Sequence, residues 1–121
     1  MNTETAELFT PAPEWSGRSD GPGPEHARWH SVINQSTDSP APVTLLGFAS
    51  DEGVLRNGGR QGAAAGPAAL RAALGSLAVH HEHALADAGT ITTQADDLDG
   101  SHDALSDKVQ ELVEAGTLPI I

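Results

Sequence analysis

One stretch constrains the fold more than any other: an apolar run, VTLLGFA at Val43–Ala49, leads into a glycine-rich loop and then into a helix. A near-continuous apolar run of this length is typical of a strand covered on both faces, as in parallel sheets. A Gly-Pro pair at 66–67 suits the first helical turn, where proline is tolerated. Leu70, Leu74 and Leu77 then follow at spacings of four and three, which predicts an apolar helix face.

The same order recurs further along the chain. LADAGTI at Leu85–Ile91 predicts a second strand, and the acidic stretch DDLDGSHD at 96–103 predicts a loop. Ser101 is the expected N-cap of the next helix, and Gly116 is expected to end that helix. The helix has apolar residues at Leu105, Val109, Leu112 and Val113.

TLPII at 117–121 predicts a third strand. Alternation of strands and helices predicts an α/β fold, a parallel sheet with helical crossovers, in which the three strands are neighbours. We assign this domain to residues 43–121.

Residues 1–42 differ in composition, being rich in Pro, Ser, Thr, Gly and acids. They predict an irregular N-terminal arm with one short helical turn around GPEHARWHSVI and little contribution to the core. A disordered tail is the alternative, although Trp15, Trp29 and the Val32-Ile33 pair argue against complete disorder.

Charge and composition exclude several classes of function. The chain carries 17 Asp and Glu against 6 Lys and Arg, a formal net charge of −11. This charge argues against nucleic acid and anionic membranes as partners. There is no cysteine, and hence no disulfide framework or thiolate chemistry. No signal peptide or apolar span is visible, so a cytoplasmic protein is expected.

The loop between the first strand and helix is the candidate binding site. Ligands of open α/β sheets bind beyond the carboxyl ends of strands, where this loop lies. Arg56 and Arg60 offer planar donors that match a carboxylate, Asn57 can donate and accept, and Gly58 permits close backbone approach. The alternative is an exposed loop whose glycines only make turns. The loop matches neither the P-loop nor the dinucleotide-binding pattern.

Two stretches superficially suggest metals, and neither predicts a site. His80, His81 and His83 lack carboxylates at ligand spacing, so a solvated helix-to-strand connection is expected. The acidic stretch can be aligned on a calcium loop with Gly100 at its sixth position. Ala95 then occupies the first position, which needs an oxygen ligand, and Ser106 the twelfth, which needs a Glu. No calcium site is therefore predicted.

The segments LLGFASDEGVLRNGGRQGAAAGPAALRAAL, LADAGTI and LPII resemble the arginase/agmatinase (ureohydrolase) family. The extended DEG…RNGGR loop points to the formimidoylglutamase branch, as does WSGRSDGPGPEHARWH in the arm. The resemblance implies a three-layer fold of which this chain is the N-terminal part. It also implies hydrolysis of N-formimidoyl-L-glutamate to L-glutamate and formamide in histidine degradation, by a hydroxide bridging two manganese ions.

The family's metal-binding segments have no counterpart in this sequence, so no metal ligand or catalytic residue is assigned, and the 121 residues alone are expected to be inactive. The resemblance implies that the loop belongs to the substrate pocket. The chemistry of its residues then predicts substrate binding by Arg56, Asn57, Gly58 and Arg60, with Arg56 or Arg60 binding a glutamate carboxylate and Asn57 orienting the substrate. Asp51 and Glu52 are expected to pair with the arginines. The complete enzyme is expected to be a homo-oligomer. The alternatives are a freestanding, non-catalytic α/β interaction module and another ureohydrolase.

Overall fold

The computed structural model describes residues 2–35 and 41–121. Four strands form one sheet in the order β1-β3-β2-β4. The central strands are β2 (Val43–Ala49) and β3 (Leu85–Thr92), flanked by β1 (Phe9–Thr10) and β4 (Leu118–Ile120). β2 pairs in parallel with both β3 and β4, which confirms the prediction of three neighbouring parallel strands. β1 runs antiparallel to β3.

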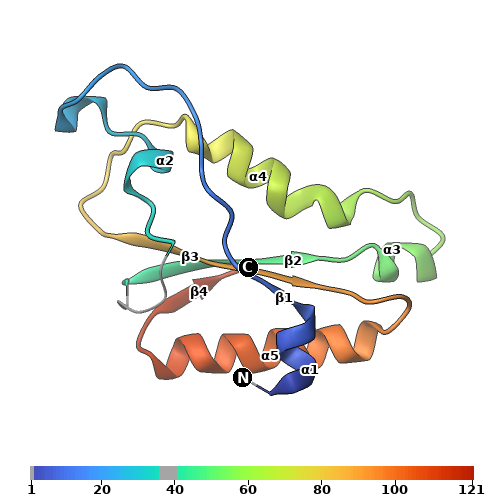
Figure 1. Cartoon of the computed structure of the whole chain (residues 1–121). Helices are drawn as coiled ribbons and strands as arrows, with labels where there is room; N and C mark the ends of the chain where they lie inside the picture. The colour runs from blue at the N-terminus through green and yellow to red at the C-terminus, as the bar shows by residue number, and fades with distance from the viewer. Residues whose placement is uncertain (1, 36–40) are drawn as a thin grey trace.

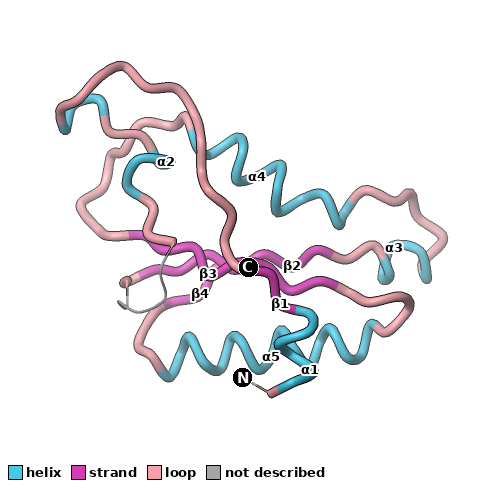
Figure 2. The backbone as a smooth tube through the Cα atoms, viewed as in Figure 1, coloured by secondary structure: helices cyan, strands magenta, loops and turns pink. Residues whose placement is uncertain are grey.

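Helices cover both faces of this sheet and give three layers (Figure 1). α4 (Gly66–Gly75) joins β2 to β3, and α5 (Leu98–Glu114) joins β3 back past β2 to β4. Crossovers between parallel strands are right-handed. Because these two run in opposite directions across the sheet, their helices must lie on opposite faces, as Figure 2 shows.

α5 and the first helix cover the face that holds the apolar core. α1 (Thr3–Leu8) packs beside α5. The core cluster consists of Leu8, Leu46, Ala88, Ile91, Ala104 and Leu112. Since Leu8 is only 5% exposed and β1 adds a strand, the first forty residues contribute more to the core than the sequence predicted.

α5 begins earlier than predicted. Asp97, not Ser101, is its N-cap, and the Asp97 side chain accepts from the backbone N–H of Gly100. Ser101 is instead buried inside the helix, so the acidic stretch is largely helical. Val113 does not face the core, being 58% exposed. Gly116, with a φ of 87°, follows the helix end as predicted.

The other face is held by a buried ion pair. Asp87 of β3 is completely buried, and its carboxylate accepts two hydrogen bonds from the Arg71 guanidinium of α4, at 2.8 and 2.9 Å. The indole N–H of Trp15 donates to the same carboxylate at 2.8 Å. The pair therefore joins the sheet, α4 and the N-terminal arm.

The rest of the arm is anchored to the end of α4 and the segment that follows it. Arg28 binds Asp20 and the carbonyl of Ser76, and the backbone N–H of Trp29 donates to Leu77. Where one short helical turn was expected, the arm has two, the 3-10 helix η1 (Pro24–His26) and α2 (Trp29–Val32). The arm residues thus have structural partners at the amino edge of the parallel strands. The boundary at residue 42 remains a prediction.

No helix within the described residues is long and apolar enough to cross a membrane.

We expect Asp87→Ala to lower the free energy of unfolding by about 3–5 kcal/mol, because it leaves the Arg71 guanidinium buried without its carboxylate. Urea denaturation followed by circular dichroism measures the change. Gln110→Ala, which removes an exposed hydrogen bond to Glu114, is the control and should change stability by less than about 0.5 kcal/mol. An Asp87→Ala effect as small as the control's would contradict this role of the pair.

Candidate functional site

The carboxyl ends of β2 and β3 form a topological switch point, the place at which open α/β sheets have a crevice. The loop after β2 leads to α4 on one face, and the loop after β3 leads to α5 on the other, so the two loops diverge. Ligands of open α/β sheets bind at such a point. The first side chains beyond the two strands, Ser50 and Thr93, lie within hydrogen-bond distance, the Thr93 hydroxyl donating to that of Ser50 at 2.7 Å.

The loop after β2 contains a short helix, α3 (Glu52–Arg56), that the sequence did not predict. The Arg56 guanidinium donates from Nε to Glu52 at 3.0 Å and from Nη2 to the backbone carbonyl of Asp96 at 2.8 Å. The predicted pairing of Glu52 with an arginine is confirmed. Arg56 therefore links the loops on the two sides of the crevice.

Asp51 does not pair with an arginine, so that prediction is wrong. Its Oδ1 atom accepts the backbone N–H groups of Gly62 at 3.0 Å and Ala64 at 2.9 Å. These bonds hold the pKa of the Asp51 carboxyl below its usual range, and the bond from Ala64 has the larger effect. The carboxylate thus closes the loop that begins at its own residue.

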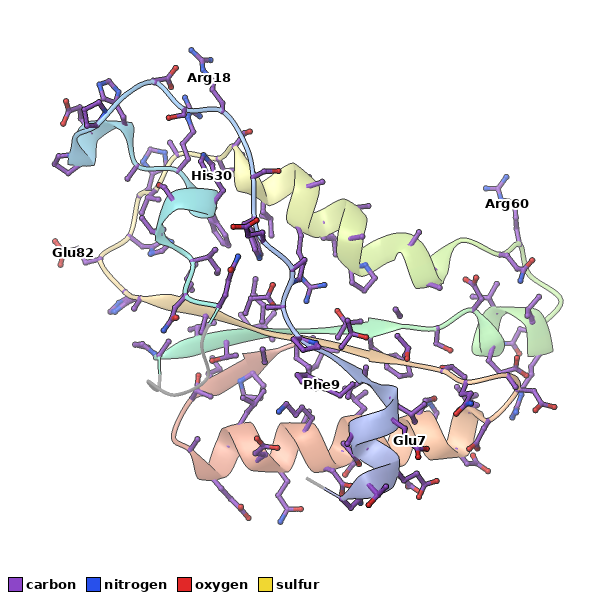
Figure 3. The ribbon with its side chains drawn as sticks, in the orientation of Figure 1. Glu7, Phe9, Arg18, His30, Arg60 and Glu82 are labelled. Atoms are coloured by element: carbon purple, nitrogen blue, oxygen red, sulfur yellow. The ribbon has the colours of Figure 1, made fainter. Side chains whose placement is uncertain are left out.

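The remaining predicted binding residues lie on the exposed part of this loop. The Asn57 side chain is exposed, and its backbone N–H donates to Gly53. Gly58 has a φ of 68°, and its N–H donates to Leu55. Arg60 extends into solvent, away from the sheet (Figure 3). The structure therefore places Arg56 between the loops that follow β2 and β3, and Arg60 in solvent.

The described residues contain no group of three or more His, Cys, Asp or Glu side chains that could hold a metal ion. The histidine-rich segment lies before β3, at the amino edge of the sheet. His81 is only partly exposed there, and its ring contacts Trp29 edge-on at 5.8 Å between ring centroids. The sequence predicted a solvated connection, and His80 and His83 are exposed as such a connection requires, whereas His81 packs against the arm.

A cavity of about 480 Å³ lies beside α4 rather than in the crevice. Its lining is mainly apolar and comes from β2, α4 and the end of the chain, including Leu45, Leu70, Leu74 and Ile120. Leu70 is 65% exposed, so part of the predicted apolar face of α4 lacks a partner within the described residues.

Sequence reasoning missed Ser50, Thr93 and the backbone carbonyl of Asp96 as groups that meet at the crevice. A hydroxyl residue directly after or near the end of two predicted parallel strands was an available signal for the first two. The Asp96 carbonyl had no such signal, because any residue type carries that acceptor.

Comparison with known proteins agrees with the geometry. Residues 41–121 match the model of the arginase family. The chain is 48% identical over 110 residues to a formimidoylglutamase of Corynebacterium efficiens, covering 88% of this chain and 35% of the relative.

A formimidoylglutamase of Nocardia farcinica is 44% identical over 113 residues, covering 92% of this chain and 36% of the relative. A formimidoylglutamase of Enterobacter sp. is 44% identical over 117 residues, covering 93% of this chain and 38% of the relative. The chain therefore spans about a third of the length of the curated relatives it matches. No solved structure matches it.

The lowered pKa of Asp51 predicts how loop order depends on pH. Since the pKa is lower in the folded state, the stabilisation is complete above the unfolded value, about pH 4, and is lost as the pH falls through the folded pKa. Protection of the Gly62 and Ala64 amides from hydrogen exchange, corrected for intrinsic rates, should therefore be constant above pH 5 and decrease in strong acid.

The amide of Gly59 is the control, because it donates to the backbone carbonyl of Val54 in the same loop. Its protection should be retained when that of Gly62 and Ala64 first falls. Equal loss at all three amides would indicate general unfolding instead of protonation of Asp51.

Proposed function

This chain belongs to the arginase family, and on that premise we propose that the polypeptide containing it is a formimidoylglutamase. The reaction would be hydrolysis of N-formimidoyl-L-glutamate to L-glutamate and formamide, in histidine degradation. The observation that carries this proposal is the similarity to proteins named formimidoylglutamase along nearly the whole chain, the DEG…RNGGR loop included. The position of that loop beside the β2–β3 crevice supports it further.

Residues 1–121 would contribute substrate recognition to this reaction. The substrate carries two carboxylates, and a guanidinium is the side chain that matches a carboxylate through two parallel N–H groups. The guanidinium of Arg56 already bonds Glu52 and the Asp96 carbonyl. That of Arg60 has no bonding partner within the described residues.

We therefore assign the carboxylate anchor to Arg60. Arg56 keeps the loop against the edge of the sheet, and Asn57 and Gly58 line the path between the two arginines. This arrangement requires the Arg60 side chain to turn from solvent toward the crevice when substrate binds, which a side chain with several rotatable bonds at an exposed position does readily.

Two manganese ions are the cofactor that the family resemblance implies. The described residues do not fit such a pair, because no three potential ligands converge among them. Their role in the proposed reaction is therefore to bind and orient substrate, and the 121 residues expressed alone are expected to release no formamide.

The proposed setting follows from the same resemblance. The enzyme would act on a small molecule in the cytoplasm as a homo-oligomer. The net charge of −11 supports the absence of nucleic acid and anionic membrane partners.

The test is formamide release from N-formimidoyl-L-glutamate by the polypeptide expressed from its whole reading frame, with added manganese. We expect turnover of this substrate and little turnover of agmatine or arginine. Preferred turnover of either would favour another ureohydrolase. No turnover of any of the three would favour the non-catalytic interaction module.

Arg60→Ala is expected to raise KM roughly 10- to 100-fold, because a hydrogen-bonded charge contributes about 1.5–3 kcal/mol, while kcat changes little. Arg60→Lys should recover only part of the loss, since an ammonium lacks the planar fork. Steady-state kinetics measure both. An unchanged KM in Arg60→Ala, together with a raised KM in Arg56→Ala, would transfer the anchor to Arg56.

A further inference from the structure

We propose that Asp51 is the positioning residue of the substrate loop: its carboxylate fixes the far end of the loop and thereby sets where Arg56–Arg60 can reach. This inference rests on the proposed function and extends it to a residue that would not itself touch the substrate.

The contacts of Asp51 span the whole loop. Its Oδ1 atom holds Gly62 and Ala64, eleven and thirteen residues further along the chain. All four predicted binding residues lie between Asp51 and Gly62 in the sequence. The carboxylate therefore replaces an open connection by a closed loop, which reduces the conformations open to every residue inside it.

The acceptor is also in the right place electrostatically. The 3-10 helix η2 (Ala63–Ala65) runs directly into α4, and its own N-cap is Gly62, which has no side chain to accept the first N–H groups. Asp51 accepts one of these groups, the N–H of Ala64, and also the N–H of the N-cap residue Gly62. A carboxylate at a helix N-terminus is favoured by the helix dipole.

The backbone at Gly62 makes this geometry possible. Its φ of 152° lies in a region that residues with a side chain rarely adopt. The unusual conformation turns the N–H group of Gly62 and that of Ala64 toward the same oxygen. Closure of the loop therefore depends on both residues: Asp51 supplies the acceptor atom, and Gly62 supplies the backbone conformation.

The other acid of the loop acts locally. Glu52 pairs with Arg56 four residues away within α3. Loss of Glu52 would remove one bond within α3, whereas loss of Asp51 would detach the far end of the loop at Gly62 and Ala64, beyond the bonds of Arg56. This difference assigns the positioning of the segment to Asp51.

The experiment compares Asp51→Ala with Asp103→Ala in the polypeptide expressed from its whole reading frame. Asp103 is an exposed acid on α5 and serves as the matched control for loss of one negative charge. We measure hydrogen exchange of the Gly62 and Ala64 amides, the Kd of L-glutamate, and kcat and KM for N-formimidoyl-L-glutamate.

For Asp51→Ala we expect at least tenfold faster exchange at both amides, at least tenfold weaker binding of L-glutamate and a KM raised by a similar factor, with kcat within about threefold of the wild type. Asp51→Asn keeps an oxygen acceptor and should recover part of each change. Asp103→Ala should match the wild type in all of them.

Three results would overturn the proposal. Exchange that is unchanged in Asp51→Ala would show that the carboxylate does not hold the loop. Faster exchange with unchanged L-glutamate binding and KM would show that the loop does not position a substrate group. A large loss of kcat with unchanged exchange would make Asp51 a catalytic residue.

The two proposals fail in different ways. If the wild type does not hydrolyse N-formimidoyl-L-glutamate, the proposed function fails, and the exchange measurement still decides whether Asp51 holds the loop. Circular dichroism shows whether Asp51→Ala is folded. If it is not, Asp51→Asn is compared with Asp103→Ala instead. Amide exchange and L-glutamate binding that are the same in these two variants would overturn the proposal.

Discussion

The structure depends on one desolvated ion pair, Arg71 with Asp87. A carboxylate without any exposure is stable only if its lone pairs are satisfied, because desolvation costs several kcal/mol per ion. Asp87 receives donors from Arg71, from the Trp15 indole and from the backbone N–H of Gly89. The Arg71 guanidinium in turn donates to the hydroxyl of Thr90 and the carbonyl of Gly89. Three separate parts of the chain must be in place before these two charges are satisfied.

Space for the pair is provided by Gly47 in the central strand. A Cβ atom there would lie 2.9 Å from Pro67 Cβ and 3.3 Å from the Arg71 guanidinium, closer than side chains normally pack. The missing side chain lets α4 approach the sheet closely enough for Arg71 to reach β3. With α4 fixed on this face, and α5 on the other, the loops after β2 and β3 must separate, and their separation creates the crevice. The candidate site is thus a consequence of how α4 is anchored.

The strand pattern could be predicted from sequence because it rests on local apolar runs, and Val43–Ala49 and Leu85–Thr92 appear almost as expected. The start of α5 could not be placed as well, since Asp97 and Ser101 are both good N-caps and only the burial of Ser101 decides between them. The contribution of Leu8 was hidden because α1 has only six residues, too few for a clear helical period, and the two-residue strand that follows it shows no period either. Asp87 gave a signal that was overlooked: a charge within an apolar strand needs a buried partner.

At the candidate site, residue types were predictable and partners were not. Glu52 and Arg56 lie four residues apart, so their pairing follows from helix geometry once α3 forms. Asp51 instead bonds backbone groups eleven and thirteen residues away, a choice that depends on the conformation of Gly62 and not on residue type. A pattern of acids and arginines therefore suggests ion pairs even where the backbone supplies the donors.

The two ends of the sheet are held by interactions of different strength, and this difference suits the proposed function. At the amino edge, the arm is joined to the fold through a completely buried carboxylate, where hydrogen bonds are strong and unpaired groups are costly. At the carboxyl edge, the loop is held by bonds of Asp51 and Arg56 that water can reach and weaken. Loops that bind ligands belong to the less stable parts of a protein, because they must rearrange at little cost. A firmly held amino edge therefore allows the loop at the opposite edge to move while β2, β3 and the crevice between them keep their geometry.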